Sequence, residues 1–339
     1  MRLPIIHVLF YSIAGTDPNF WAVLVAGSRG FTNYRHQADL CHTHIFFTES
    51  LRVNPSRVVV MMYDDIAWSN ENPLIGRLYN EPNGTNVYEH CSPDYRASEV
   101  SLENLDFVLS SGKDPSSYEY YSRKRIHSDH TSTVFLSFVD HGEPGGLLFP
   151  NGQTLTGNKF LDIVSRMNNR YAQLVVYIEA CYAGSVFDNI QLPDNVIVIT
   201  ASNATESSWG TFCPTAKHPS ADVINGIHVG SCLADLFEIS WKRDLENRLS
   251  IRDFNISFGE HLHAVKLFVA KKSNVMMYGD LGLLNKPLHE IFPYPSATAN
   301  FGLQSHLTDS DIILDSAEIQ KRSISPILPE THTLPLLAV

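Results

Sequence analysis

The chain has 339 residues, of which 44% are hydrophobic and 18% are charged, so it can bury a large core and lacks the composition of a disordered protein. Acidic residues outnumber basic ones by 36 to 25, and the net charge is −11. The densest basic cluster, Arg123-Lys124-Arg125, lies among tyrosines and histidines, so we expect a solvated loop there and no nucleic-acid partner.

The N-terminal residues have the pattern of a secretory signal. Met1-Arg2 precedes a mostly apolar run over residues 3–14, which predicts a signal peptide over residues 1–15; a fraying N-terminal segment is the alternative. Three N-x-S/T triplets fit the secretory route as candidate glycosylation sites: Asn83, Asn203 and Asn255. No apolar run is long enough to span a bilayer, so no stable membrane anchor is expected.

Short, continuously apolar runs alternate with segments of helical periodicity in the remaining chain. We expect strands over residues 21–26, 58–63, 134–139, 174–178, 196–201 and 275–278. Helices are expected over residues 36–50, 100–109, 158–167 and 231–243, and from Ser250, which has capping-box spacing to Asp253, toward Lys271. This alternation predicts an α/β fold with a mainly parallel six-stranded sheet flanked by helices.

The domain organisation follows from where this alternation stops. Residues 16–290 are expected to form one domain, which carries a polar insert over residues 69–121. Residues 291–339 contain repeated prolines and predict an irregular tail with a short amphipathic piece near residues 311–322.

Two predicted strands end in reactive side chains. Asp140-His141-Gly142 follows one strand, and Glu179-Ala180-Cys181 follows the next. Because the carboxyl ends of parallel strands meet at one edge of a sheet, we expect His141 and Cys181 to lie close together. An imidazole can activate a thiol, and the amides of Gly142 and Cys181 could stabilise an oxyanion. The pair therefore predicts a catalytic cysteine, although either residue alone would more often be a buried thiol or a loop histidine.

Five cysteines occur, none of them in a C-x-x-C motif, so no structural metal site is expected. An odd number allows one or two disulfides and leaves at least one cysteine outside them. Cys41 falls on the apolar side of its predicted helix and is expected in the core. Cys91, in the polar insert, could be a free thiol.

Six motifs in order along the chain resemble the legumains, or asparaginyl endopeptidases, which share a clan with the caspases. They are Trp21–Ser28, Asn33–Asp39, Met62–Ala67, Asp140–Gly142, Glu179–Cys181 and Glu206–Thr211. The resemblance covers roughly residues 19–285. It implies a caspase-like fold and an endopeptidase that cleaves after asparagine through an acyl-enzyme, with ligase activity by the same intermediate. It further implies no cofactor, protein or peptide substrates with accessible asparagine, cystatin-type inhibitors, and a lysosomal, vacuolar or secreted location.

The resemblance also assigns roles to individual residues. It makes Cys181 the nucleophile, His141 the catalytic histidine, Asn33 a residue that orients the histidine loop, and Asp140 an aspartate that can become a succinimide. The implied substrate pocket consists of Arg35, His36, Glu179, Ser207, Ser208 and Asp235. It further implies a disulfide between Cys213 and Cys232.

The pocket residues suit an asparagine side chain on chemical grounds as well. A carboxamide has one carbonyl acceptor and two N–H donors, so Arg35 can donate to it while Glu179 and Asp235 accept from it. At low pH a protonated aspartic acid resembles asparagine, so cleavage after aspartate is expected there. A structural ion pair between Arg35 and Asp235 is the simpler alternative.

The chain departs from the legumain pattern in two places. Tyr182 and Ala183 follow the predicted nucleophile where the family usually has Glu-Ser, and residues 291–339 stand where legumains have a long helical prodomain. Two other functions stay open: a GPI-anchor transamidase-like catalytic subunit, which would have the same dyad, and a legumain-like glycoprotein that has lost catalysis.

Overall fold

The computed structural model describes residues 19–110, 123–294 and 336–338, and its centre is a six-stranded sheet. The strand order is β13-β8-β7-β3-β1-β2. These strands are β1 (Phe20–Ala26), β2 (Val58–Met61), β3 (Thr133–Val139), β7 (Gln173–Glu179), β8 (Val196–Thr200) and β13 (Met276–Gly279). Only β13 runs antiparallel to its neighbour, so the mainly parallel six-stranded sheet expected from the sequence is confirmed.

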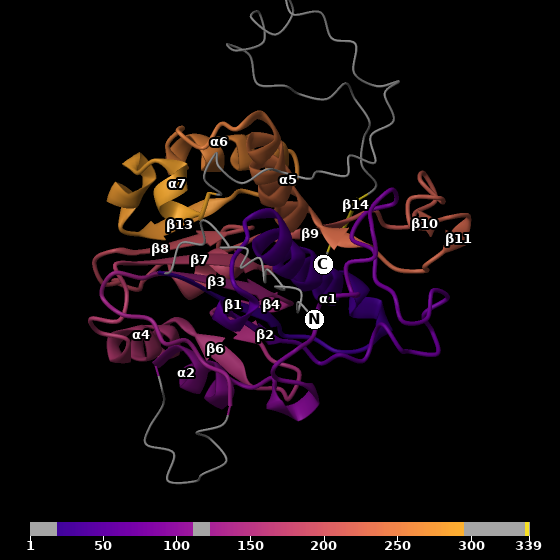
Figure 1. The fold of residues 1–339 in the computed structure, drawn as a ribbon. Coiled ribbons are helices and arrows are strands. Elements are labelled where there is room, and N and C mark those ends of the chain that lie inside the picture. The colour runs from indigo at the N-terminus through magenta and orange to yellow at the C-terminus, as the bar shows by residue number, and fades with distance from the viewer. Residues whose placement is uncertain (1–18, 111–122, 295–335, 339) are drawn as a thin grey trace, which may run out of the picture.

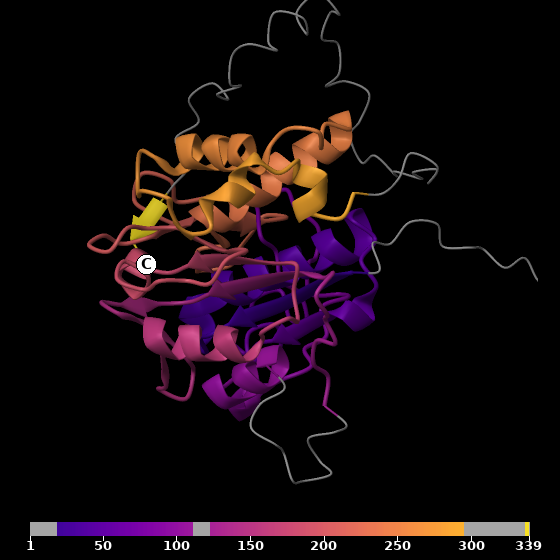
Figure 2. The same cartoon turned by 90° about the vertical axis from the view of Figure 1, so that its left-hand side faces the viewer.

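Helices cover both faces of this sheet (Figures 1 and 2). One face packs against α1 (Tyr34–Ile45), α5 (Leu236–Ile251), α6 (Phe258–Val269) and α7 (Leu288–Ile291). The other packs against α2 (Leu102–Ser110) and α4 (Gly157–Arg166). The strands alternate between the two cores: in β1, Ala22 and Leu24 face the first helix layer while Val23 and Val25 face the second. Both faces are fully buried, which is why these strands read as unbroken apolar runs.

Shorter elements surround the central sheet. Two small sheets are formed by β4 (Gly142–Glu143), β5 (Gly146–Leu148) and β6 (Thr154–Thr156), and by β10 (Val223–Ile224) and β11 (Ile227–His228). A third has the order β12-β9-β14, with β12 (Ala234–Asp235), β9 (Trp209–Thr211) and β14 (Leu336–Ala338). A π-helical turn (Phe46–Ser50) continues α1, and 3₁₀ turns occupy Phe31–Asn33, Pro55–Arg57, Ala97–Glu99, Ala183–Val186 and Leu281–Asn285.

Two helix starts differ from the sequence-based expectation. The helix expected from residue 231 begins at Leu236, because Ala234 and Asp235 stay extended and pair with β9. The capping box expected at Ser250 is wrong, since α5 runs through that residue to Ile251. The real capping box lies at Ser257, whose hydroxyl accepts from the amide of Glu260 while the Glu260 carboxylate accepts from the amide of Ser257.

Two disulfides cross-link the chain, and one of them corrects an expectation. Cys213 is joined to Cys232, as the resemblance implied. Cys41 is buried as expected, but it is bonded to Cys91, which is therefore not a free thiol. The polar insert folds back over α1, where Tyr79 donates its amide to the hydroxyl of Tyr34, and this brings the two cysteines together. Cys181 lies outside both disulfides.

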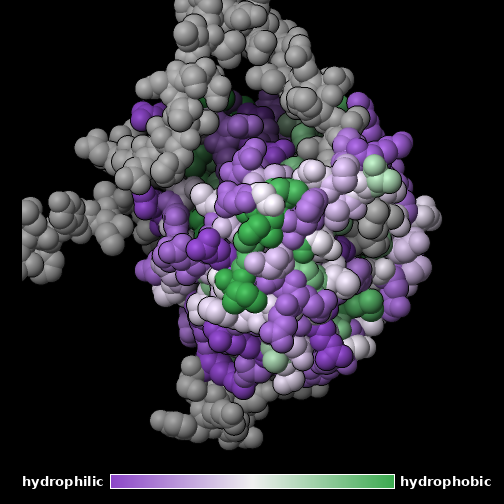
Figure 3. Space-filling view, turned by 90° about the vertical axis from the view of Figure 1, so that its right-hand side faces the viewer, coloured by the Kyte–Doolittle hydropathy of each residue, from purple (hydrophilic) through white to green (hydrophobic). Residues whose placement is uncertain are grey.

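Several expectations concern residues outside the described ranges, namely the signal peptide over residues 1–15 and the amphipathic piece near residues 311–322. No helix in residues 19–110 and 123–294 is long and apolar enough to cross a membrane. Figure 3 shows the face that carries β10 and β11, where apolar and hydrophilic side chains are interspersed. The large exposed hydrophobic side chains among the described residues are Trp68, Ile75, Ile227, Ile251, Leu267 and Leu281.

Candidate active site

The carboxyl ends of the neighbouring strands β3 and β7 lead into the two loops that carry the predicted catalytic residues. Val139 and Glu179 are register partners in the parallel pair, and the amide of Asp140 donates to the carbonyl of Glu179 at 3.0 Å. His141 and Cys181 each follow their strand by two residues. The two loops then touch, because a Cβ added to Gly142 would collide with the carbonyl oxygen of Cys181. Only glycine allows this close approach between the histidine loop and the cysteine loop.

Asn33, at the start of α1, fixes the orientation and the tautomer of His141. The Asn33 amide nitrogen donates to the carbonyl of Arg29 at 2.8 Å, so its Oδ1 is the atom that lies 2.8 Å from His141 Nε2. Because Oδ1 can only accept, Nε2 carries the ring proton and Nδ1 is left as the acceptor. Burial and the positive charge of Arg35 lower the pKa of His141 to about 4. The imidazole is therefore neutral and able to accept a proton near neutral pH.

Serine hydroxyls hold the loop that carries Cys181. Ser202 donates to the carbonyl of Ala180 at 2.9 Å and accepts from the amide of Ala183 at 3.2 Å. Cys181 is 4% exposed, and the hydroxyl of Ser208 lies 4.0 Å from its sulfur. Tyr182 adopts a left-handed conformation with φ of 53°, and its amide donates to the carbonyl of Glu206. The chain thus turns sharply straight after the cysteine.

The remaining predicted pocket residues form a buried polar cluster around Arg35. The Nε of Arg35 donates to Oδ1 of Asp235 at 2.9 Å, and both side chains are buried. Among the described residues, buried side-chain atoms without a hydrogen-bond partner in this cluster include Nη2 of Arg35, Oδ2 of Asp235 and both carboxylate oxygens of Glu179, together with Nε2 of His36 and Oδ1 of Asp140. Donors and acceptors without partners therefore belong to one cluster, which suits a ligand that both accepts and donates.

Burial shifts the pKa values of the ionisable side chains in this cluster. Burial raises the pKa of Glu179 well above its usual range, and the nearby charge of Asp235 raises it further. Burial also raises the pKa of Asp235, while Arg35 opposes that rise. Burial and the charge of Arg35 lower the pKa of His36 well below its usual range, so its ring is neutral. Its Nδ1 lies 2.7 Å from the hydroxyl of Ser28.

Two further predicted residues border the site. Asp140 is 2% exposed, burial raises its pKa well above the usual range, and its Oδ1 lies 3.5 Å from His36 Nδ1. Ser207 is half-buried and lies just before β9. A Cβ added to Gly210 of β9 would lie 3.4 Å from Cδ of Arg35 and 3.3 Å from the sulfur of Cys232. The middle of β9 and the Cys213–Cys232 disulfide therefore form one wall beside Arg35.

Ligand atoms of His36, Asp140 and His141 lie within 4.8 Å of one another, a spacing compatible with a metal ion. However, one ring nitrogen of each histidine already has a hydrogen-bond partner and is not available to a metal ion. His36 Nδ1 contacts Ser28 and His141 Nε2 contacts Asn33. Arg35 also contributes a positive charge that disfavours a second cation here. We therefore assign these three residues to the polar cluster.

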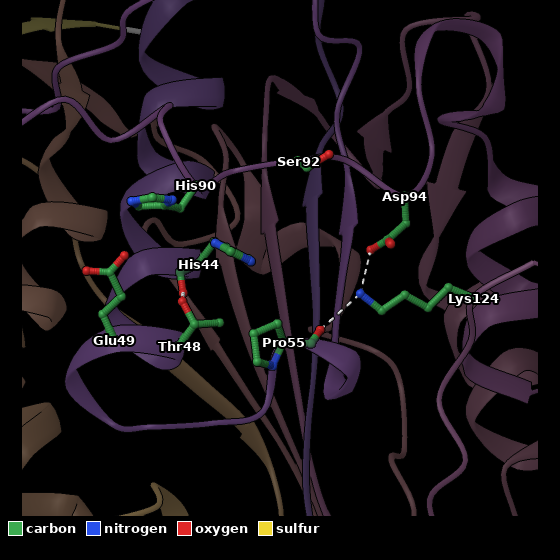
Figure 4. Close-up of a pocket in the computed structure, with 8 residues that line it drawn as sticks. All are labelled: His44, Thr48, Glu49, Pro55, His90, Ser92, Asp94 and Lys124. Carbon is green, nitrogen blue, oxygen red and sulfur yellow. Dashed lines mark hydrogen bonds and ion pairs between the residues drawn. The ribbon is translucent and has the colours of Figure 1, made fainter. Parts of the chain in front are cut away.

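A cavity of about 470 Å³ lies at the opposite edge of the sheet, near the start of β2 (Figure 4). It is lined by His44, Thr48, Glu49, Pro55, His90, Ser92, Asp94 and Lys124, none of which the sequence analysis assigned to a site. The ammonium of Lys124 lies 3.0 Å from Asp94 and donates to the carbonyls of Pro55 and Val58. Lys124 of the basic cluster therefore makes structural contacts within the fold.

The three candidate glycosylation sites differ in exposure. Asn83 and Asn255 are exposed, whereas Asn203 is half-buried and its side chain accepts from the amide of Thr205.

Sequence reasoning missed the buried residues that contact the polar cluster, chiefly Asp39, Glu238 and Lys242. The Glu238–Lys242 spacing of four residues on one helix was the available signal, but it did not show that the pair is buried.

Comparison with known proteins identifies the family of this chain. Residues 20–300 match the Peptidase C13 family. Legumain of Canavalia ensiformis is 37% identical over 290 residues, which are 83% of this chain and 59% of that protein. A vacuolar-processing enzyme of Glycine max is 37% identical over 293 residues, which are 84% of this chain and 57% of that protein. The chain thus spans less than two thirds of the length of either relative.

Among solved structures, caspase-1 from Spodoptera frugiperda aligns with a TM-score of 0.45 and 11% identity, covering 88% of this chain and 99% of that one. The family match and the two relatives each extend over most of the chain, including both strand ends that carry His141 and Cys181. The chain therefore belongs to the Peptidase C13 family.

Proposed function

We propose that this protein is a cysteine endopeptidase that cleaves peptide bonds after asparagine, with Cys181 as nucleophile and His141 as base. One observation carries the proposal. The neutral imidazole of His141 donates through Nε2 to Asn33 and keeps Nδ1 as an acceptor, on a loop packed against the backbone of Cys181. The family membership supports the same assignment.

The reaction begins when His141 Nδ1 takes the proton of the Cys181 thiol and the sulfur attacks the carbonyl carbon of the scissile bond. The amides of Gly142 and Cys181 stabilise the resulting oxyanion. His141 then returns the proton to the leaving amine, the C–N bond breaks, and a thioester remains on the sulfur. Water hydrolyses this acyl-enzyme; a peptide amine that attacks instead forms a new peptide bond, which is the ligase reaction.

The polar cluster accounts for the proposed preference. Nη2 of Arg35 donates to the side-chain carbonyl of asparagine, and Glu179 with Oδ2 of Asp235 accepts from its NH₂ group, so the ligand satisfies the unpaired buried atoms. Aspartate fits the same positions once its carboxyl is protonated at acidic pH. The substrate backbone is proposed to lie along β9, which β14 pairs with in antiparallel register.

Further roles are part of the same proposal. Asp140 lies beside the site with a raised pKa. The raised pKa favours the protonated form of this carboxyl, and that form can cyclise on the following amide with loss of water. The two disulfides support an oxidising compartment, and relatives are named vacuolar-processing enzymes, so we propose the secretory route to a vacuole or lysosome, or secretion. Protein substrates and cystatin-type inhibitors are the proposed partners.

The test uses three peptides that differ only in the residue before a fluorogenic leaving group: asparagine, aspartate or glutamine. Wild type is expected to cleave the asparagine peptide at pH 5 to 7, and the aspartate peptide only at the acid end. Cys181→Ala is expected to bind the peptide without turnover. Equal rates from wild type and Cys181→Ala would remove the mechanism. A folded wild type that neither cleaves peptides nor reacts at Cys181 with an alkylating reagent would favour the non-catalytic alternative.

A further inference from the structure

A fully buried lysine, Lys242 of α5, lies beneath the pocket and takes no part in the proposed chemistry. Its side chain is 0% exposed. Its ammonium lies 3.1 Å from the carbonyl and 3.3 Å from Oδ1 of Asp39, 3.4 Å from the hydroxyl of Thr43, and 3.2 Å from Oε2 of Glu238. Burying an ammonium group costs free energy unless its partners compensate for the lost water. We therefore ask which function this buried lysine serves.

Asp39 of α1 connects this lysine to the pocket. While its Oδ1 contacts Lys242, its Oδ2 accepts the backbone amide of Asp235 at 2.8 Å. The side-chain amide of Asn80 also donates to Oδ1 of Asp39, at 2.9 Å. Asp235 in turn binds the Nε of Arg35. A continuous path of hydrogen bonds therefore runs from Lys242 through Asp39 and Asp235 to the guanidinium that faces the pocket.

The number of buried carboxyl groups around this path explains why a cation is needed at Lys242. Five carboxyl groups are buried in this cluster, those of Asp39, Asp140, Glu179, Asp235 and Glu238, whereas Arg35 and Lys242 are its only lysine or arginine cations among the described residues. Removing one of the two cations would leave one positive charge for five carboxyl groups. In a low-dielectric interior the carboxyl groups would then bind protons or take in water, and their geometry would change.

We propose that Lys242 is a positioning residue of the specificity pocket, which anchors Asp39 and thereby fixes Asp235 and Arg35 in the arrangement that recognises a carboxamide. This inference rests on the proposed function of the pocket. Lys242 itself does not touch the substrate. Its removal is therefore expected to act on substrate affinity rather than on the reacting atoms.

The groups that face Asp39 also predict how the effect depends on pH. They are Lys242 and Glu238 of α5 and Asp235 of β12, with the neutral Asn80 and Thr43 completing the surroundings. Burial raises the pKa of Asp39 to about 7, and Lys242 opposes that rise. Without the lysine the pKa rises further. Near pH 7.5 Asp39 is then more fully ionised in wild type than in the variant, whereas toward pH 5 both approach the protonated form.

The experiment compares wild type with Lys242→Met, using the asparagine peptide and rates corrected for titrated active sites. Losing a charged hydrogen-bond partner predicts that KM rises about tenfold at pH 7.5 while kcat changes less, and that the KM ratio shrinks toward pH 5. Lys286→Met is the matched control, because its ammonium binds Gln173 at the start of β7, away from the pocket. General destabilisation would lower the amount of active enzyme but not change KM in this pH-dependent way.

A second variant covers the case in which Lys242→Met does not fold. Asp39→Asn combined with Lys242→Met removes both buried charges and keeps a neutral acceptor for the amide of Asp235. Its KM is expected between those of wild type and Lys242→Met, or above wild type if it alone folds. Faster amide exchange in the segment around Asp235 is expected in either variant. Wild-type KM and wild-type exchange in every folded variant would overturn the inference. Absence of wild-type cleavage would instead count against the proposed function, and the exchange measurement would still decide the role of Lys242.

Discussion

Replacing Asn33 with alanine removes the oxygen that orients His141 and leaves the thiol and the pocket side chains in place. The two hydrogen bonds of the Asn33 side chain, to Arg29 and to His141, are both 2.8 Å long. A hydrogen bond of this kind contributes about 1 to 2 kcal/mol, which corresponds to a factor of roughly 5 to 30 in rate. We expect kcat to fall by about that factor in Asn33→Ala, because the ring can rotate away and its Nε2 proton loses its partner.

Asn33→Asp tests whether the charge next to His141 matters separately from the orientation of its ring. The aspartate keeps an acceptor for His141 Nε2 but adds a negative charge, which stabilises the protonated imidazole and raises its pKa from about 4. Since the base is lost as pH falls through this pKa, the acid limb of kcat/KM should move to higher pH in Asn33→Asp and stay in place in Asn33→Ala.

The assay is cleavage of the asparagine peptide from pH 3.5 to 7.5, with active sites titrated by alkylation of Cys181. The pH dependence of alkylation itself provides a second measurement that needs no substrate. An Asn33→Ala enzyme with wild-type kcat, together with an Asn33→Asp enzyme whose acid limb has not moved, would refute the assignment of His141 Nε2 as the oriented donor.

Three further changes test separate parts of the structure. Gly142→Ala should lower kcat/KM at least about a hundredfold, because its methyl group would displace the carbonyl of Cys181; measured activity near wild type would show that the loops are not packed as described. Deleting residues 336–339 should lower KM for peptides, since β14 then no longer pairs with β9; an unchanged KM would mean that substrate does not use this edge. Replacing Cys41 and Cys91 with serine should reduce the free energy of unfolding by roughly 4 kcal/mol, as expected for a bridge spanning 50 residues, and chemical denaturation with and without reductant would check it.

The sequence predicted the part of the site that depends on local pattern and strand order. Apolar runs located β3 and β7, and the rule that parallel strands end at one edge placed His141 near Cys181. The register of Val139 with Glu179 and the contact at Gly142 agree with that reasoning. Burial on both faces made these runs easy to recognise, because no polar alternation interrupted them.

Features that depend on distant contacts could not be predicted in the same way. Cys41 and Cys91 approach only because the polar insert folds back over α1. The two-residue strand β12 is too short to leave a pattern, yet it delays the start of α5 to Leu236 and places Asp235 against Arg35. Local spacing cannot show such pairings, because the partners lie 50 and 200 residues apart.

Under the proposed function, the excess of buried carboxyl groups favours a neutral substrate side chain over a negatively charged one, beyond what hydrogen bonding alone would do. An ionised aspartate side chain would add a further negative charge beside Glu179 and Asp235, whose pKa values burial already raises. A neutral carboxamide of the same shape adds none, and it supplies N–H donors to the carboxyl oxygens that have no hydrogen-bond partner. The ratio of kcat/KM for asparagine over aspartate should therefore be large near pH 7. It should decrease as pH falls toward about 4, the ordinary pKa of an aspartate. A ratio that stays constant from pH 7 to pH 4 would show that shape, rather than charge, determines the selection.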